Sequence, residues 1–329
     1  MQTRRIGNVD VPAIGLGCMN LSHAYGTPPD TETATELLQR AFDLGVRHFD
    51  TAALYGFGAN ETLVGQAIKP FRQQIHLASK CGMTGVNGAR VIDGRPETLL
   101  KTIDEALQRL QTDHIDLYYL HRWDKNVPIE ESVGAMARMV EAGKIGGIGL
   151  SEVGADTLRK AHAEHPIAAV QTEYSLWTRN PEIAVLDACR ELGAAFVAFS
   201  PVARGFLAGG VDDPADLVEK DIRRNMPRFQ QPHFGNNQEW LAQYARLAES
   251  AGCTMAQLAL AWLLTKGEHV LPIPGTTSFS HLQENFEAAD LTLSSAVIEA
   301  LESLVNEKTV SGNRYPDATQ AEIDTEEFV

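Results

Sequence analysis

Cysteine is scarce in this chain of 329 residues, and long apolar runs are missing. The four cysteines, Cys18, Cys81, Cys189 and Cys253, form no Cys-x-x-Cys pair, which argues against a zinc motif and indicates a reducing compartment. No stretch approaches the roughly 18 apolar residues of a membrane span, and no apolar segment follows the first residues. We therefore expect no signal peptide and no membrane span, and we predict a cytoplasmic location.

Positive charge is also in deficit. Lysine and arginine total 28 against 43 aspartates and glutamates, which gives a formal net charge of −15. Because binding to a phosphate backbone needs a basic face, we expect no nucleic acid partner. An anionic cofactor is not excluded, since a few local positive groups and helix N-termini are enough to bind one. His162 and His165 lie three residues apart without a carboxylate or cysteine partner, so we expect no metal site.

A third absence is the glycine fingerprint of open dinucleotide-binding sheets, because no Gly-x-Gly-x-x-Gly follows the first predicted strand. Short apolar runs typical of buried parallel strands alternate instead with amphipathic helical runs. Eight such repeats without a linker predict one domain over residues 1–329, folded as an α/β protein of the (β/α)₈ TIM-barrel type. The predicted strands are Ile14–Gly17, Val46–Asp50, Ile75–Ser79, Ile115–Leu120, Ile145–Leu150, Ala168–Thr172, Ala195–Phe199 and Val270–Ile273.

Turn and capping residues predict the ends of several elements. Gly7-Asn8 indicates an N-terminal hairpin over Arg4–Ile14. The pattern Thr33–Glu36 fits a capping box, and Gly45 is placed to end the helix that follows. Pro96 is placed to begin another amphipathic helix.

The last third of the chain adds elements to the repeats. A long loop is predicted over residues 200–235 after the seventh strand, and loops of that length are usually functional. Helices are predicted over Asn236–Ala251 and Thr254–Leu264, and the first of them is an addition to the barrel. From about residue 306 the chain is polar and acidic, which predicts either a tail over the barrel face or a loosely ordered end.

Four reactive residues fall at the carboxyl ends of three consecutive predicted strands. Asp50 ends the second strand, Tyr55 lies in the loop after it, Lys80 ends the third strand and His121 ends the fourth. Catalytic residues of barrels come from these strand ends and loops, and adjacent parallel strands lie about 4.8 Å apart. We therefore predict that the four side chains meet at one catalytic site.

This set of residues suits proton donation to a carbonyl that is being reduced. A carbonyl that accepts hydride becomes an alkoxide and needs a proton donor. A lysine ammonium about 4 Å from a tyrosine favours the phenolate by roughly 4 kcal/mol, or about three pKa units, and burial opposes this effect. We therefore expect the pKa of Tyr55 to be lowered by less than that amount. Asp50 would keep Lys80 charged, and His121 would hydrogen-bond the carbonyl oxygen.

These residues stand in motifs that resemble the aldo-keto reductase family. Phe49-Asp50-Thr51-Ala52 with Leu54-Tyr55-Gly56 is similar to the family signature, and the resemblance covers roughly residues 6–304. Gly15–Met19 and Ser311–Pro316 are most similar to the branch that includes pyridoxal reductases. Further motifs in family order are Ser79-Lys80, Leu120-His121-Arg122, Gly149-Leu150-Ser151, Gln171-Thr172-Glu173-Tyr174, Phe199-Ser200-Pro201, Ile273-Pro274-Gly275-Thr276-Thr277 and Glu284-Asn285.

The resemblance implies a (β/α)₈ barrel and reversible NAD(P)H-dependent reduction of aldehydes or ketones, with Tyr55 as the general acid. It also implies that Ser151 and Gln171 hold the nicotinamide carboxamide, that Phe199 stacks on the ring, and that Asn285 reaches the adenine. The cofactor-binding residues implied by the family are Gly17, Cys18, Met19, Asp50, Ser151, Glu152, Gln171, Phe199, Ser200, Pro201, Ala203, Gly205, Gly275, Thr276, Thr277, Ser278, His281, Glu284 and Asn285.

One departure from the family concerns the adenosine phosphate. Relatives that prefer NADPH usually place a cation at the position of Ser278, of His281, or of both, and this chain has no lysine or arginine there. A charge-assisted hydrogen bond to phosphate is worth about 1.5–3 kcal/mol, so its loss weakens the preference. NADPH remains the expected cofactor on the resemblance, with NADH as its rival and Arg204 as another candidate cation.

Two other functions compete with a reductase that acts on small carbonyl compounds. A cofactor-binding regulatory subunit could use the same fold, and the intact set of four reactive residues argues against it. A metal-dependent barrel hydrolase would need an early His-x-His motif, which this sequence lacks. The sequence leaves the physiological substrate and the oligomeric state open. It offers Tyr25, Phe57, Trp123 and Trp177 as aromatic candidates for the substrate pocket without showing which of them face it.

Overall fold

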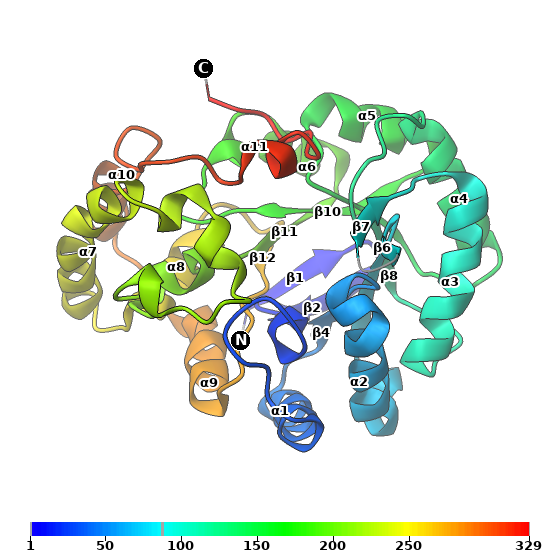
Figure 1. The fold of residues 1–329 in the computed structure, drawn as a ribbon, viewed down its shortest axis with the longest axis horizontal. Coiled ribbons are helices and arrows are strands. Elements are labelled where there is room, and N and C mark those ends of the chain that lie inside the picture. Colours follow the sequence, from blue (N-terminus) through cyan, green and yellow to red (C-terminus); the bar gives the residue numbers. More distant parts are fainter. Residues whose placement is uncertain (1, 87–88, 329) are drawn as a thin grey trace.

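The computed structural model describes residues 2–86 and 89–328. Eight parallel strands lie side by side in one sheet, and each pairs with its neighbour along the chain. Gly15 and Gly17 donate backbone hydrogen bonds to the carbonyls of Pro272 and Pro274, at 3.1 and 3.2 Å, which joins the first strand to the last. The predicted (β/α)₈ barrel is thereby confirmed (Figure 1). The strands are β3 (Leu16–Gly17), β4 (His48–Asp50), β5 (His76–Cys81), β8 (Leu117–Leu120), β9 (Ile148–Ser151), β10 (Ile167–Glu173), β11 (Ala195–Phe199) and β12 (Val270–Pro272).

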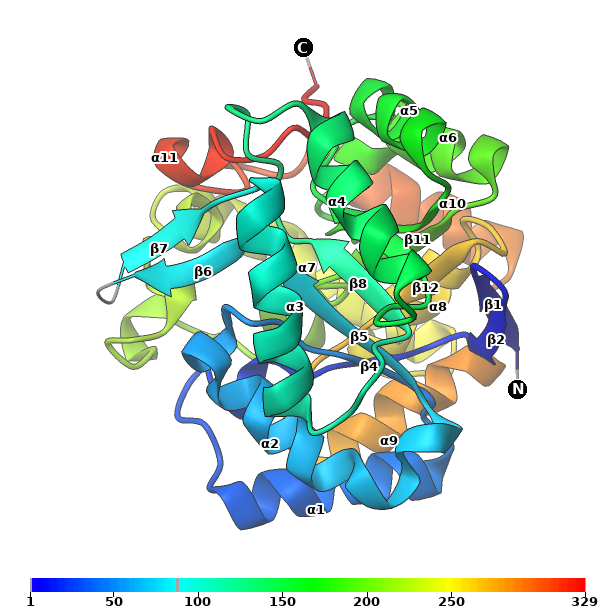
Figure 2. The same cartoon turned by 90° about the vertical axis from the view of Figure 1, so that its right-hand side faces the viewer.

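Helices surround the barrel, as Figures 1 and 2 show. Those that follow successive strands are α1 (Thr31–Leu44), α2 (Ala59–Ile68), α3 (Pro96–Leu110), α4 (Ile129–Glu141), α5 (Ala155–Glu164), α6 (Val185–Leu192), α8 (Met255–Leu264) and α9 (Phe279–Glu287). The additions are α7 (His233–Ser250), α10 (Ser295–Leu304) and α11 (Asp317–Gln320). In the described ranges no single helix is long and apolar enough to cross a membrane, although the bent pair α7 and α8, with an angle of 78°, meets that length and composition together.

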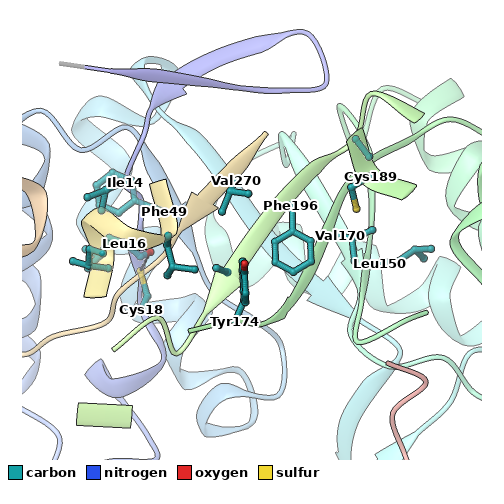
Figure 3. Packing of buried hydrophobic residues seen from close by; sticks show 14 of the residues in the cluster. Ile14, Leu16, Cys18, Phe49, Leu150, Val170, Tyr174, Cys189, Phe196 and Val270 are labelled. Atoms are coloured by element: carbon teal, nitrogen blue, oxygen red, sulfur yellow. Dashed lines mark hydrogen bonds between the residues drawn. The ribbon is translucent and has the colours of Figure 1, made fainter. Parts of the chain in front are cut away.

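Alternation along the strands separates the outer core from the barrel interior. In β11, Phe196 and Ala198 pack in the cluster between strands and helices, whereas Ala195 and Val197 pack inside the barrel. Figure 3 shows part of the outer cluster, including Phe49 of β4 and Phe196. Since successive side chains of a strand point to opposite faces, the neighbours of these outer residues point inward. This alternation places the reactive strand-end side chains inside the barrel mouth.

A short hairpin covers the amino end of the barrel. Its strands are β1 (Thr3–Ile6) and β2 (Val9–Pro12), which confirms the hairpin predicted over Arg4–Ile14. Ile6 and Val11 belong to the interior cluster, and Arg4 Nε donates to the Val270 carbonyl at 3.1 Å. In Figure 2 this hairpin lies on the opposite side of the molecule from a second hairpin.

The second hairpin, β6 (Met83–Val86) and β7 (Ala89–Ile92), lies between β5 and α3 and was not predicted. The Asn87-Gly88 dipeptide in the sequence is the signal that could have indicated it.

One helix start was predicted wrongly. α1 begins at Thr31, and the Asp30 side chain accepts from the Thr33 backbone N–H at 2.8 Å. Aspartate is as good an N-cap as threonine, and it comes earlier in the chain. The proposed capping box at Thr33–Glu36 therefore does not form, although Gly45 ends this helix in the left-handed conformation, as expected.

Residues 306–328 lie across the carboxyl end of the barrel, where Lys125 and Glu152 hydrogen-bond to Ile323 and Thr325. Arg314, Tyr315 and Ile323 are buried in this segment, and Tyr315 lines the cavity described below. Arg314 makes an ion pair with Glu152 at 2.6 Å. The long segment after β11 contains short 3₁₀ turns, beginning at Ala203–Ala208.

Two histidines contact each other near the amino end of the barrel, where β4 and β5 begin. The Nδ1 atoms of His48 and His76 lie 2.9 Å apart, and both side chains are buried. Burial lowers the pKa of His48 far below its usual value, and burial also lowers the pKa of His76 to about 4. The pair is therefore neutral at pH 7.

This pair should make the fold sensitive to acid. The unfolded chain takes up protons at histidine near pH 6.5, whereas folded His76 does so only near pH 4, so stability falls as pH drops between these values. Each group contributes at most about 1.4 kcal/mol per pH unit in this window. In urea unfolding, the free energy of unfolding should fall less between pH 7.5 and 4.5 for His76→Gln than for the wild type. The control His165→Gln, outside the pair, should lose as much as the wild type. An equal dependence of the unfolding free energy on pH in all three proteins would contradict this explanation.

Candidate active site

Three of the four predicted catalytic residues form a chain of contacts. Lys80 Nζ makes an ion pair with Asp50 Oδ1, donates to the Thr51 carbonyl at 2.8 Å, and lies 3.1 Å from the Tyr55 hydroxyl. The Tyr55 and His121 ring centroids are 5.9 Å apart at an interplanar angle of 84°. Asp50, Lys80 and His121 come from β4, β5 and the end of β8, which are adjacent in the sheet. The structure thus brings all four side chains together.

Burial dominates the ionisation of this cluster. Burial raises the pKa of Tyr55 and outweighs the Lys80 ammonium, which acts to lower it. The expected lowering of the Tyr55 pKa was therefore wrong in sign, because strand order indicates the neighbouring ammonium but not the depth of burial. Burial acts to lower the pKa of Lys80, but the Asp50 carboxylate and Tyr55 more than offset it, so Lys80 is charged.

His121 is neutral in this environment. Burial lowers its pKa far below the usual value, and the positive charges of Arg122 and Lys80 lower it further. Its Nδ1 atom is buried and has no hydrogen-bond partner within the part of the chain that the structure describes. A neutral imidazole carries one N–H, so His121 can donate to a carbonyl oxygen without adding a charge.

Two buried amides hold the cluster in place. Gln171 of β10 donates to Asp50 Oδ2 at 2.7 Å, so both Asp50 oxygens have partners. Asn60, fully buried at the start of α2, accepts from the Thr51 hydroxyl at 2.6 Å and donates to the Cys18 carbonyl at 2.8 Å. Asn60 was not predicted; a polar residue directly after the Tyr55 loop was its only signal in the sequence.

A cavity of about 650 Å³ opens beside the cluster at the carboxyl end of the barrel, and Asp50, Tyr55 and His121 line it. Most of the predicted cofactor-binding residues line it as well. They are Gly17, Cys18, Met19, Asp50, Ser151, Gln171, Phe199, Ser200, Pro201, Gly205, Gly275, Thr276, Thr277, His281, Glu284 and Asn285.

Other predicted residues lie elsewhere. Glu152 accepts from Arg314 at 2.6 Å and from Thr325 at 2.7 Å, so its carboxylate anchors the C-terminal tail and does not line the cavity. Its φ of +55° turns the chain at the end of β9. Ala203 is buried behind the cavity wall, and the Ser278 hydroxyl caps α9 by accepting from the His281 N–H at 3.5 Å.

The arginines and aromatic residues that line the cavity were predicted only in part from the sequence. Arg204, suggested for the cofactor phosphate, makes an ion pair with Glu173 at 2.7 Å. Of the aromatic candidates for the substrate pocket, Tyr25 lines the cavity, whereas Trp177 is buried against Phe206. The remaining aromatic candidates, Phe57 and Trp123, do not line it. Arg122, Arg223 and Tyr315 line it without having been predicted to do so.

Glycines allow the strand ends and loops of the cavity wall to pack closely against one another. A Cβ atom at Gly17 would lie 2.9 Å from the Ile273 carbonyl, and one at Gly275 would lie 2.9 Å from Asn20 Oδ1. Gly205 has a φ of +91°, in the left-handed region that favours glycine. The N-terminus of α9 faces the same wall through Thr276 and Thr277, and helix N-termini bind phosphate.

Comparison with known proteins decides the family. The model of the aldo/keto reductase family matches residues 13–306. The chain belongs to the aldo/keto reductase family. An aldo-keto reductase of Schizosaccharomyces pombe, yakc, is 43% identical over 328 residues, which cover 98% of this chain and 96% of that protein. A probable aldo-keto reductase of Glycine max is 42% identical, with coverage of 93% and 89%.

Solved aldo-keto reductase structures share the fold. The glycerol dehydrogenase of Gluconobacter oxydans matches with a TM-score of 0.84 at 26% identity, and covers 92% of this chain and 94% of its own. An aldo-keto reductase of Klebsiella pneumoniae in complex with NADPH matches with a TM-score of 0.73 at 27% identity, with coverage of 95% and 98%. The placement in the pyridoxal reductase branch stays a prediction. The described residues contain no group of three potential metal ligands. Membership of the aldo/keto reductase family makes the chain an oxidoreductase and not the metal-dependent hydrolase considered above.

Proposed function

We propose that this aldo/keto reductase reduces small aldehydes or ketones to alcohols with NADPH, reversibly, and that Tyr55 donates the proton. The observation that carries the proposal is the 3.1 Å contact of buried Lys80 Nζ with the hydroxyl of Tyr55, which lines the cavity. Two relatives support the choice of cofactor, since the S. pombe protein is named for NADP(+) and the K. pneumoniae structure holds NADPH. When bound, the nicotinamide supplies the hydride.

Tyr55 suits proton donation even though burial raises its pKa. A raised pKa keeps the hydroxyl protonated at neutral and mildly alkaline pH, and an alkoxide is a much stronger base than a phenolate. Lys80 stabilises the phenolate that donation leaves behind, because its ammonium already contacts the hydroxyl oxygen. Neutral His121 donates its N–H to the substrate oxygen and orients it toward Tyr55.

The cofactor would lie along the wall described above. Ser151 and Gln171 offer side-chain groups for the carboxamide, and Phe199 offers a ring for stacking on the nicotinamide. Thr276 and Thr277 at the start of α9 would meet the adenosine phosphates, with His281 beside them. Arg204 already makes an ion pair with Glu173, so backbone N–H groups and His281 are the groups that we expect to meet the 2′-phosphate.

One assay tests the reaction and the cofactor together. The consumption of NADPH and of NADH is followed by absorbance against a panel of aldehydes that includes pyridoxal. We expect turnover with both cofactors and a higher kcat/KM with NADPH. Tight NADPH binding without turnover of any aldehyde would contradict the proposal and would indicate a cofactor-binding regulatory protein.

A further inference from the structure

The arginines of the cavity differ in whether they are neutralised. Arg90, Arg204 and Arg223 line the cavity, and each makes an ion pair, with Glu322, Glu173 and Asp221 respectively. Arg122 also lines the cavity and is 8% exposed. Arg122 forms no ion pair, since no carboxylate oxygen within residues 2–86 and 89–328 lies within 4.0 Å of its guanidinium.

The hydrogen bonds of Arg122 leave part of its guanidinium free. Nη1 donates to the His121 carbonyl at 2.7 Å and to the Ser151 hydroxyl at 3.3 Å, and both acceptors are neutral. Nε is buried without a partner among the described residues, and Nη2 makes no hydrogen bond to them. A buried cation that is only partly hydrogen-bonded is costly, because burial removes water without supplying an opposite charge.

From these observations we infer that Arg122 binds an anionic group on the substrate, so that the preferred substrates are aldehydes carrying a carboxylate or a phosphate. The inference rests on the proposed reductase function and adds a substrate class to it. Arg122 directly follows His121, so the guanidinium lies beside the residue that is proposed to hold the reacting carbonyl. A substrate that places its carbonyl at Tyr55 and His121 can therefore reach Arg122 with a second group.

Nearby acidic groups do not take the place of this anion. Glu152 is the acidic residue whose charge interacts with Arg122, but its oxygens accept from Arg314, Thr325 and the Glu173 N–H. Asp50 is held by Lys80 and Gln171. The Nη2 group of Arg122, which makes no hydrogen bond to the described residues, therefore remains available to a ligand. Guanidinium groups bind carboxylate and phosphate oxygens through charge-assisted hydrogen bonds.

Two pairs of aldehydes separate charge from shape and carboxylate from phosphate. The first pair is 4-carboxybenzaldehyde and 4-formylbenzamide, and the second is glyceraldehyde 3-phosphate and glyceraldehyde. For each pair, the readout is the ratio of kcat/KM for the anion to kcat/KM for its neutral analogue. In the wild type we expect a ratio of about 10 to 100 in at least one pair, because a charge-assisted hydrogen bond contributes about that factor. The pair that shows this ratio identifies whether the preferred anionic group is a carboxylate or a phosphate.

Two variants assign the preference to its residue. Arg122→Gln should bring the ratio close to one, whereas Arg246→Gln, the same substitution at an exposed position of α7, should leave it at the wild-type value. If Arg122→Gln does not fold, Arg122→Lys, which keeps the buried charge but not the forked N–H groups, should lower the ratio below the wild-type value. A wild-type ratio near one in both pairs, or a wild-type ratio retained in the folded Arg122 variant, overturns the inference. If the wild type turned over none of the four aldehydes, that result would instead refute the reductase function itself.

Discussion

Lys80→Met should be one of the most destabilising single substitutions in this protein. It is expected to lower the free energy of unfolding by about 3–5 kcal/mol, because it leaves the Asp50 carboxylate buried without its ion-pair partner. Lys80 and Asp50 side chains are 0% and 2% exposed, so water cannot replace the lost ammonium. Gln171 would remain as a donor to Asp50, but an amide does not neutralise a charge. The measurement is urea unfolding at pH 7.5.

Two further variants isolate the buried ion pair as the cause. The double variant Lys80→Met with Asp50→Asn should recover most of the lost stability, since it removes the stranded charge. Lys144→Met breaks an ion pair with Asp104 whose side chains are 36% and 63% exposed, and it should cost less than about 1 kcal/mol. Equal losses of unfolding free energy for Lys80→Met and Lys144→Met would contradict the claim that burial makes the Asp50–Lys80 pair more important for stability than an exposed pair.

The barrel could be predicted from the sequence because its strands and helices repeat a strong pattern. Ala195–Phe199 was predicted with the bounds that the structure gives, and the other strands differ by only a few residues at their ends. Elements that interrupt the pattern were harder to predict. The β6–β7 hairpin lies between a strand and its helix, and α1 starts at an N-cap that competes with the capping box chosen from the sequence.

The meeting of Asp50, Tyr55, Lys80 and His121 followed from the order of the strands, because neighbouring parallel strands end on the same side of the barrel. Side chains in the loops did not follow from that order. Glu152 and Arg204 have positive φ values of +55° and +58°, which turn them toward the tail and Glu173. No spacing rule in the sequence indicates such a turn.

The ionisation of Tyr55 shows a second limit of reasoning from spacing alone. Strand order places an ammonium beside the hydroxyl, and that contact alone lowers the pKa. The structure adds burial of the phenol, which raises its pKa by more than Lys80 lowers it. Tyr55 is therefore better described as a protonated donor whose product, the phenolate, is stabilised by Lys80.

The most direct test of this account is hydride transfer in a single turnover by Tyr55→Phe. The enzyme is first loaded with NADPH and then mixed with an aldehyde, and the loss of NADPH absorbance is followed. Proton donation by a general acid contributes about 10²–10⁴-fold, so the rate constant should fall by that factor. Phenylalanine keeps the ring, so NADPH affinity should stay at the wild-type value. Tyr244→Phe, which removes a buried hydroxyl bonded to the Met255 carbonyl outside the cavity, should leave both values unchanged. A Tyr55→Phe rate constant within a few-fold of the wild type would contradict the assignment of Tyr55 as the proton donor.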